Sequence, residues 1–265
     1  MPDWEWDETL FAGTAPYYTA GRVPYPPQLI DGIRRELGLD GTGRLLDVGC
    51  GPGTLTLLLA PLFAEAVGVD PDAGMLAEAA RRPGAAGIRW HRARGEDLPA
   101  GLGRFRVVTF AQSFHWMDQS LVAARVRDHL LEPGGAWVHV GGGVAEPAPL
   151  QARIDELVAR YLGPVRRAGQ GFLPNGTASG EEDVLRAAGF TGPTRIRVDG
   201  DPVERKPDDI VAAVLSRSSS APHLFGDRRP AFEADLRGLL ADSSASGRFT
   251  EPAATFEAVI WRHPD

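Results

Sequence analysis

The chain has 265 residues, of which 43% are hydrophobic and 24% are charged, an ordinary composition for a globular protein. A net charge of −7 disfavours nucleic acid and other anionic polymers as partners. The single cysteine, Cys50, excludes an internal disulfide and a cysteine-based zinc cluster, and we expect no metal site. No apolar run reaches about 18 residues and no leader-like segment opens the chain, so we expect no membrane contact and a cytoplasmic location.

Strand-like and helix-like segments alternate through the first half of the chain. The predicted strands are 44–48, 66–69, 88–92, 106–110 and 136–140, and the predicted helices are 54–62, 73–82 and 120–131. Short connections between such segments favour parallel pairing with right-handed crossovers. The first half therefore predicts a doubly wound parallel sheet.

The alternation is less regular after residue 142. Helices are expected at 147–167, 208–215 and 232–240, and strands at 194–198 and 255–261. Ser179 and Glu182 have the spacing of a capping box, which predicts a further helix that ends near Ala188.

A glycine-rich turn joins the first predicted strand to the helix after it. Residues 45–54 read LLDVGCGPGT, with Asp47 two residues before the first glycine. Glycines at such a junction let the backbone and the start of a helix approach a ligand closely. A second apolar run ends in Asp70, and an acidic residue about 20 positions after the turn is placed to hold a pair of ribose hydroxyls.

A nicotinamide-dependent dehydrogenase is one interpretation of this pattern, but its details argue against it. That fingerprint requires Gly or Ala at its sixth position, where this chain has Thr54. Asp47 would also lie near a pyrophosphate, which is electrostatically unfavourable, whereas it suits a ligand with a positive group. The non-functional alternative is a tight turn whose carboxylate only caps backbone N–H groups.

Five segments together resemble class I S-adenosylmethionine-dependent methyltransferases, of the small-molecule, type 11-like subgroup. They are YTAGRVPYP at 18–26, DVGCGPG at 47–53, VGVDPD at 67–72 with Met75, RGEDLP at 94–99 and TFAQSFHWMD at 109–118. The resemblance is close over 18–140 and loose beyond it. It implies an α/β fold with a doubly wound, Rossmann-like sheet of seven strands, an antiparallel last strand, and helical insertions that form a cap.

The resemblance also implies a set of residues that bind S-adenosyl-L-methionine. They are Tyr18, Arg22, Asp47, Gly49, Gly51, Asp70, Pro71, Met75, Gly95, Glu96, Ala111 and Gln112. Asp70 would accept both ribose hydroxyls, while Pro71 and Met75 would cover the adenine, although Met75 could equally be a core residue. Backbone carbonyls near Ala111 and Gln112 would receive the methionine ammonium.

The segments at 94–99 and 18–26 imply further contacts with the cofactor. Gly95, through its backbone, and Glu96 are expected at the adenine, but Arg94 stands where the family has Asp, and Glu96 could only tie its loop. Tyr18 and Arg22 would fold over the cofactor, with Arg22 paired to its carboxylate.

His115 is the candidate catalytic residue. It lies at the exit of the fourth predicted strand, where the family's methyl group is exposed, and an ordinary imidazole pKa suits proton removal near neutral pH. The alternative is that His115, beside Trp116, only orients the loop or the cofactor.

We therefore predict one methyltransferase domain over 1–265 that acts on a small molecule in specialised metabolism. Its expected parts are a lid (1–25), a cofactor-binding half (26–142) and substrate-side insertions (143–178 and 199–230). One alternative is the same scaffold binding S-adenosylmethionine for a cyclisation or rearrangement, and another is a non-enzymatic binding module. The sequence does not determine the acceptor or the oligomeric state.

Overall fold

The computed structural model describes residues 7–144, 149–168, 171–173 and 180–264. The chain divides into two compact units. The sheet unit comprises Tyr25–Gly142, Ala178–Val198 and Phe256–Asp265, and the helical unit comprises Met1–Pro24, Gly143–Thr177 and Asp199–Thr255. The expected organisation as one domain with a lid and two insertions stays a prediction.

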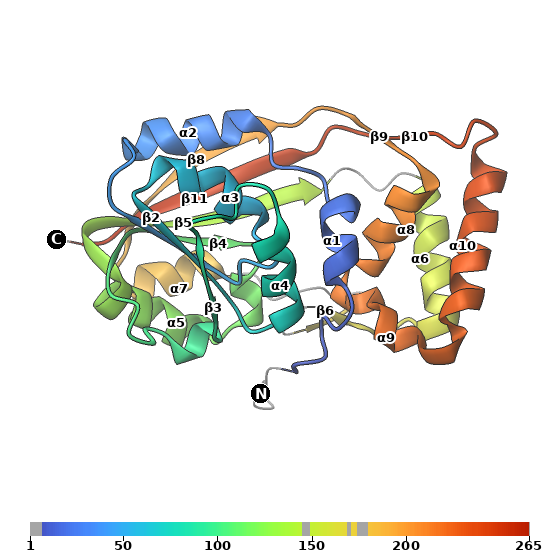
Figure 1. The fold of residues 1–265 in the computed structure, drawn as a ribbon, viewed down its shortest axis with the longest axis horizontal. Helices are drawn as coiled ribbons and strands as arrows, with labels where there is room; N and C mark the ends of the chain where they lie inside the picture. Colours follow the sequence, from blue (N-terminus) through green and yellow to red (C-terminus); the bar gives the residue numbers. More distant parts are fainter. Residues whose placement is uncertain (1–6, 145–148, 169–170, 174–179, 265) are drawn as a thin grey trace. The chain divides into compact units, whose positions relative to one another are not determined.

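A seven-stranded sheet with the order β3-β2-β1-β4-β5-β11-β8 forms the sheet unit (Figure 1). Its strands are β1 (Arg44–Val48), β2 (Glu65–Asp70), β3 (Arg89–Arg92), β4 (Phe105–Ala111), β5 (Leu131–Val144), β8 (Thr191–Asp199) and β11 (Thr255–Arg262). β1 pairs in parallel with β2 and β4, β2 with β3, and β4 with β5, while the last strands are antiparallel. The predicted Rossmann-like sheet of seven strands is thus confirmed.

Helices cover both faces of this sheet. They are α2 (Pro27–Leu37), α3 (Thr54–Leu59), α4 (Ala73–Arg81), α5 (Gln119–Arg125) and α7 (Glu181–Ala187). Figure 1 shows α2 and α3 on one side and α5 and α7 on the other, which is the doubly wound arrangement. Asp72 and Asp118 cap α4 and α5, because their side chains accept the backbone N–H of Met75 and Leu121 at 2.9 and 3.0 Å.

The helices α5 and α7 have different boundaries from those predicted. The helix expected at 120–131 continues from α5 into a π-helical turn, Val126–Leu130. The predicted cap Ser179 lies outside the described residues, and α7 begins at Glu181, with Gly180 as its N-cap in the left-handed region.

Aromatic rings dominate the core on the α5 and α7 face. Trp137 of β5 is fully buried and stacks on Phe110 of β4, with ring centroids 4.0 Å apart. Phe114 and Phe190 meet the same indole edge-on at 4.8 and 5.7 Å. This cluster packs β4 and β5 together directly below the exit of β4.

The helical unit has a separate core. Its elements are α1 (Ala15–Gly21), α6 (Pro149–Leu162), α8 (Pro207–Leu215), α9 (Pro222–Phe225), α10 (Arg229–Ser243) and the strand pairs β6 (Arg167–Ala168) with β7 (Gly171–Phe172) and β9 (Val203–Arg205) with β10 (Phe249–Glu251). Phe225 stacks on Phe232 at 4.1 Å, and both are buried with apolar residues of α6 and α8. The helix predicted at 147–167 ends at Leu162, because Gly163 has a φ of +82° and Pro164 follows it.

We expect Trp137→Ala to lower the free energy of unfolding by about 3–5 kcal/mol, because the buried indole loses its packing partners. Leu121→Ala, at a side chain that is 39% exposed, should change it by about 0.5 kcal/mol or less. Urea denaturation of both variants measures the difference. Equal midpoints for the two would contradict this account of the core.

Candidate functional site

The glycine turn and the β4 exit lie at the carboxyl edge of neighbouring parallel strands. Asp47 of β1 is in register with Gly68 of β2 and Thr109 of β4, so these three strands end side by side. In an open α/β sheet this edge, where the strand order reverses, is where ligands bind. The two amides that open the turn, Gly49 and Cys50, both donate to the carbonyl of Val69, at 2.8 and 3.0 Å. β2 therefore fixes the start of the turn.

Gly49 and Gly51 serve the turn in different ways. Both have positive φ, +68° and +54°, where a side chain is strained. A Cβ on Gly49 would lie 2.5 Å from the Cβ of Ser113, whereas a Cβ on Gly51 would meet nothing within 4 Å. Gly49 is thus required by the protein's own packing, and Gly51 borders open space in which a ligand could lie.

Asp70 connects the end of β2 to this turn. One of its carboxylate oxygens accepts the Gly51 N–H at 2.8 Å and the other accepts the Asp72 N–H at 2.9 Å. Burial raises the pKa of Asp70 to about 7, against the lowering effect of those two hydrogen bonds. Each oxygen keeps a lone pair free, so two further donors can be accepted.

Asp47 is completely buried and has its own partners. Its two oxygens accept the hydroxyls of Thr56 on α3 at 2.6 Å and Thr109 on β4 at 2.7 Å. Burial raises its pKa, and the threonine hydrogen bonds oppose that effect. The carboxylate has no exposed surface, so its geometry joins β1, α3 and β4 rather than facing a ligand.

The residues predicted around the adenine occupy different environments. Met75 is only 2% exposed, which fits the core alternative, whereas Pro71 is half-buried and its carbonyl accepts Arg92 Nε at 2.9 Å. Glu96 accepts the backbone N–H of Asp118 at 2.8 Å and so ties its loop to the start of α5. Gly95 is buried, and a Cβ there would lie 2.6 Å from the sulfur of Met117. The adenine contacts of all four stay predictions.

The β4 exit turns sharply after Ala111. Gln112 has a φ of +54°, a strained value for a residue with a side chain. Its backbone N–H donates to the Val140 carbonyl at 3.1 Å and its side-chain amide to the Gly142 carbonyl at 3.0 Å, so β5 holds the turn. Ser113, also buried, donates to the Val48 carbonyl at 2.6 Å and joins this exit to β1.

His115 lies near a second histidine, His139, that the sequence prediction missed. It lies in a short 3-10 helix, Phe114–Trp116, and burial together with the nearby His139 lowers its pKa to about 4. His139 of β5 has Nε2 3.3 Å from a carboxylate oxygen of Glu181 on α7, while its Nδ1 is buried without a hydrogen-bond partner. A lone histidine within the apolar run of 136–140 was the one available sequence signal.

The His139–Glu181 contact joins the Glu181 carboxyl group to a neutral imidazole rather than to an imidazolium. Burial lowers the pKa of His139 to about 4 and raises the pKa of Glu181, and both shifts favour the uncharged forms. At neutral pH both His115 and His139 therefore carry no charge.

Residues 45–135 match the family model described as a methyltransferase domain. The matched segment begins in β1 and includes the glycine turn, Asp70 and the β4 exit. Over this segment the chain is similar to methyltransferase domains of the class I S-adenosylmethionine-dependent type.

Curated relatives are named as methyltransferases, and a solved structure shares the fold. An uncharacterized methyltransferase of Mycobacterium tuberculosis is 29% identical over 59% of this chain and 61% of its own length. The ubiquinone/menaquinone biosynthesis C-methyltransferase UbiE of Syntrophotalea carbinolica is 32% identical over 54% of this chain and 61% of its own length. The fold is similar to that of the YcgJ protein of Bacillus subtilis, with a TM-score of 0.54 and 16% identity over 90% of this chain and 99% of that one. The chain thus spans about three fifths of these two curated relatives.

The chain has other features outside this edge. Tyr18 and Arg22 lie in the helical unit, where the guanidinium of Arg22 stacks over the Tyr18 ring at 4.7 Å. Their predicted contact with the cofactor stays a prediction. Within the described ranges, no helix has the length and apolarity needed to cross a membrane, and no group of three acidic, His or Cys side chains is arranged to hold a metal ion.

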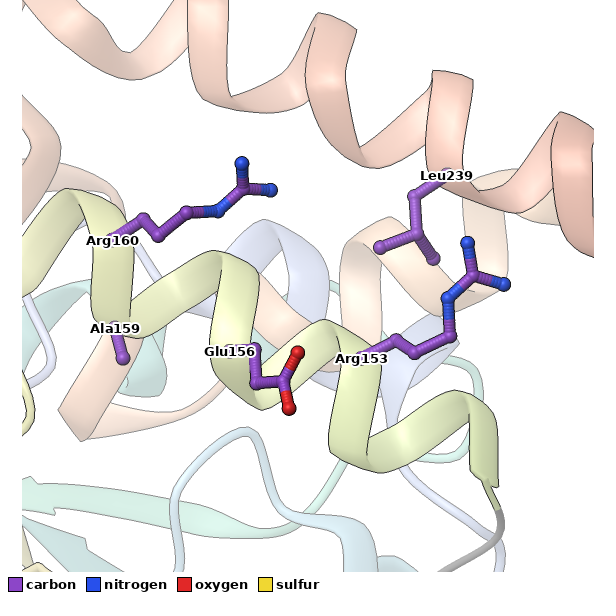
Figure 2. A pocket seen from close by; sticks show the side chains of 5 residues that line it. All are labelled: Arg153, Glu156, Ala159, Arg160 and Leu239. Atoms are coloured by element: carbon purple, nitrogen blue, oxygen red, sulfur yellow. The ribbon is translucent and has the colours of Figure 1, made fainter.

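The helical unit also has a surface hollow of about 670 Å³ beside α6 and α10. Figure 2 shows Arg153 and Arg160 extending from α6 along the same side as Leu239, with Glu156 between them. The hollow contains none of the residues predicted from the sequence.

Gly49→Ala and Gly51→Ala should differ in stability although both have a positive φ. We expect Gly51→Ala to lose about 1–2 kcal/mol from backbone strain alone. Gly49→Ala should lose about 1–3 kcal/mol more, because its methyl group overlaps Ser113. Thermal or urea denaturation of the two proteins measures this order, and an equal or larger loss in Gly51→Ala would show that Ser113 does not constrain the turn.

Proposed function

We propose that this chain transfers a methyl group from S-adenosylmethionine to a small molecule. The observation that carries the proposal is the buried Asp70 carboxylate at the tip of β2, beside the open space at Gly51. Its lone pairs suit the two vicinal hydroxyls of a ribose. When bound, the cofactor would supply an electrophilic methyl group on a positively charged sulfur.

We divide the site residues of the sheet unit into those that would contact the cofactor and those that hold the contacting residues in position. We assign Asp70, the Gly51 backbone and the carbonyls at Ala111 and Gln112 to direct contact. Asp47 acts through Thr56 and Thr109, which fix the turn and the β4 exit, and is a positioning residue. Such prealignment in a dry site is worth up to about 7–11 kcal/mol in model reactions.

His115 is assigned to proton removal from the acceptor. Its imidazole is neutral at neutral pH, so Nδ1 or Nε2 can accept a hydrogen bond from an acceptor hydroxyl and then its proton. Glu181 fixes the orientation of His139, and His139 in turn lies close enough to affect His115 electrostatically. Burial lowers the pKa of His115, so its imidazolium form is disfavoured and it passes the proton on readily.

A non-methylating cyclisation or rearrangement on this scaffold is not favoured, because the curated relatives named above are methyltransferases. A role in specialised metabolism, a small-molecule acceptor and the absence of nucleic-acid substrates belong to the proposal. The net charge of −7 supports the last of these.

Affinity for S-adenosylmethionine should rise with pH through about 7. Hydroxyl donors bind the ionised form of Asp70 more strongly, so binding below pH 7 must release a proton from a carboxyl whose pKa is about 7. We expect affinity several-fold higher at pH 8 than at pH 6, by calorimetry in two buffers of different ionisation enthalpy, which counts the proton. Asp70→Asn should bind more weakly at both pH values and show no such slope. A wild-type affinity that does not change with pH would contradict the assignment.

His115→Ala should lower kcat by about 10²-fold or more, with cofactor affinity little changed. The assay is methyl transfer from labelled S-adenosylmethionine to a panel of small hydroxyl, amine and carbon acceptors at saturating cofactor. Because the pKa is about 4 rather than 6.5, the wild-type rate should stay level from pH 8 to pH 5 and fall only near pH 4.

The exposed His129 supplies the matched control, and His129→Ala should leave kcat unchanged. If His115→Ala keeps its kcat but loses cofactor affinity, the residue belongs to the cofactor site. Absence of transfer to every acceptor, with cofactor binding intact, would contradict the proposed function itself.

A further inference from the structure

Three arginines from separate segments of the helical unit lie together. Arg22 directly follows α1, and its side chain donates to the carbonyl of Ser216 at 3.0 Å. Ser216 is the residue before Arg217. Arg166 precedes β6, and β6 packs against the 3-10 turn Ser218–Ser220 that follows Arg217. Partial burial, and then the charges of Arg22 and Arg166, lower the pKa of Arg217, so both of those guanidinium groups are within electrostatic reach of Arg217.

The carboxylates that face this cluster do not balance its charge. Asp155 lies 3.8 Å from Arg217 and is half exposed, and Glu251 is already bound by Arg205 at 2.8 Å. Among the described residues of this region, four guanidinium groups thus stand against two carboxylates. Like charges held together cost free energy unless an anion lies between them.

Donors in the cluster also lack partners. The Nε atoms of Arg22 and Arg166 are buried and make no hydrogen bond, although each side chain donates elsewhere, Arg166 to the Gly163 carbonyl at 3.2 Å. A buried donor without a partner costs about 1–3 kcal/mol, and such groups are rare in folded proteins. The Arg217 side chain keeps 40% of its surface exposed, so a solute can reach the cluster.

We propose that the helical unit binds a small oxyanion, a carboxylate or phosphate group of an organic molecule, through Arg22, Arg166 and Arg217. The planar fork of arginine matches both groups with two parallel hydrogen bonds, which would satisfy the unpaired Nε atoms. This assigns a ligand class to the helical unit and gives Arg22 a different role from the cofactor contact that the sequence resemblance implied.

Calorimetric titration of the full chain with citrate and with inorganic phosphate, against sodium chloride of equal ionic strength, tests the site. We expect one of the two to bind with a stoichiometry of one, and the tighter of them identifies the group as carboxylate or phosphate. Arg166→Gln and Arg217→Gln should each weaken that binding by about tenfold or more. Arg160→Gln, which changes an exposed arginine on α6, should not weaken it.

A thermal melt separates loss of the site from loss of the fold. Arg166→Gln and Arg217→Gln should unfold at the wild-type temperature or above it, because repulsion within the cluster is relieved. Binding of neither anion above chloride, or an equal loss in Arg160→Gln, would overturn the proposal. So would competition of S-adenosylmethionine with the anion for one site, since the cluster would then serve the cofactor's carboxylate.

Discussion

The hydrogen bond from the Gly51 amide to the Asp70 carboxylate is the contact on which the candidate site depends. It joins the middle of the glycine turn to the tip of β2, while the carbonyl of Val69 holds the first two amides of the same turn. The turn is therefore fixed by its neighbouring strand rather than by its own glycines. Glycine tolerates the positive φ, and the parallel register of β1 with β2 brings donor and acceptor together.

The two buried carboxylates at this edge differ in how fully their oxygens are hydrogen-bonded. Asp47 is enclosed and has a threonine hydroxyl on each oxygen, whereas Asp70 accepts only two backbone amides and has a pKa near 7. A carboxylate with remaining acceptor capacity and a disfavoured charge gains from a ligand that donates hydrogen bonds. This difference, rather than the presence of two acids, is why we assign Asp70 and not Asp47 to contact with the cofactor.

The surroundings of the histidines in the sheet unit and of the arginines in the helical unit affect their charges differently. In the sheet unit, burial keeps His115 and His139 neutral, which suits groups that accept protons. In the helical unit, arginines cannot lose their charge, so crowding leaves positive charge and unpaired donors in excess. Each unit thus contains polar groups that have unused hydrogen-bonding capacity. The type of group in each unit indicates which kind of ligand could bind there.

The sequence by itself determined the alternation of strands and helices, the glycine turn and the acidic tip of β2, because these follow from local periodicity and from residues close together in the chain. It could not distinguish Asp47 from Asp70, since the threonines that satisfy Asp47 lie 9 and 62 residues away and carry no motif. It also missed the contact of Glu181 with His139, which joins α7 to β5 across 42 residues. Only tertiary packing sets the burial that lowers the pKa of His115 to about 4, and burial at a given position depends on every element that covers it.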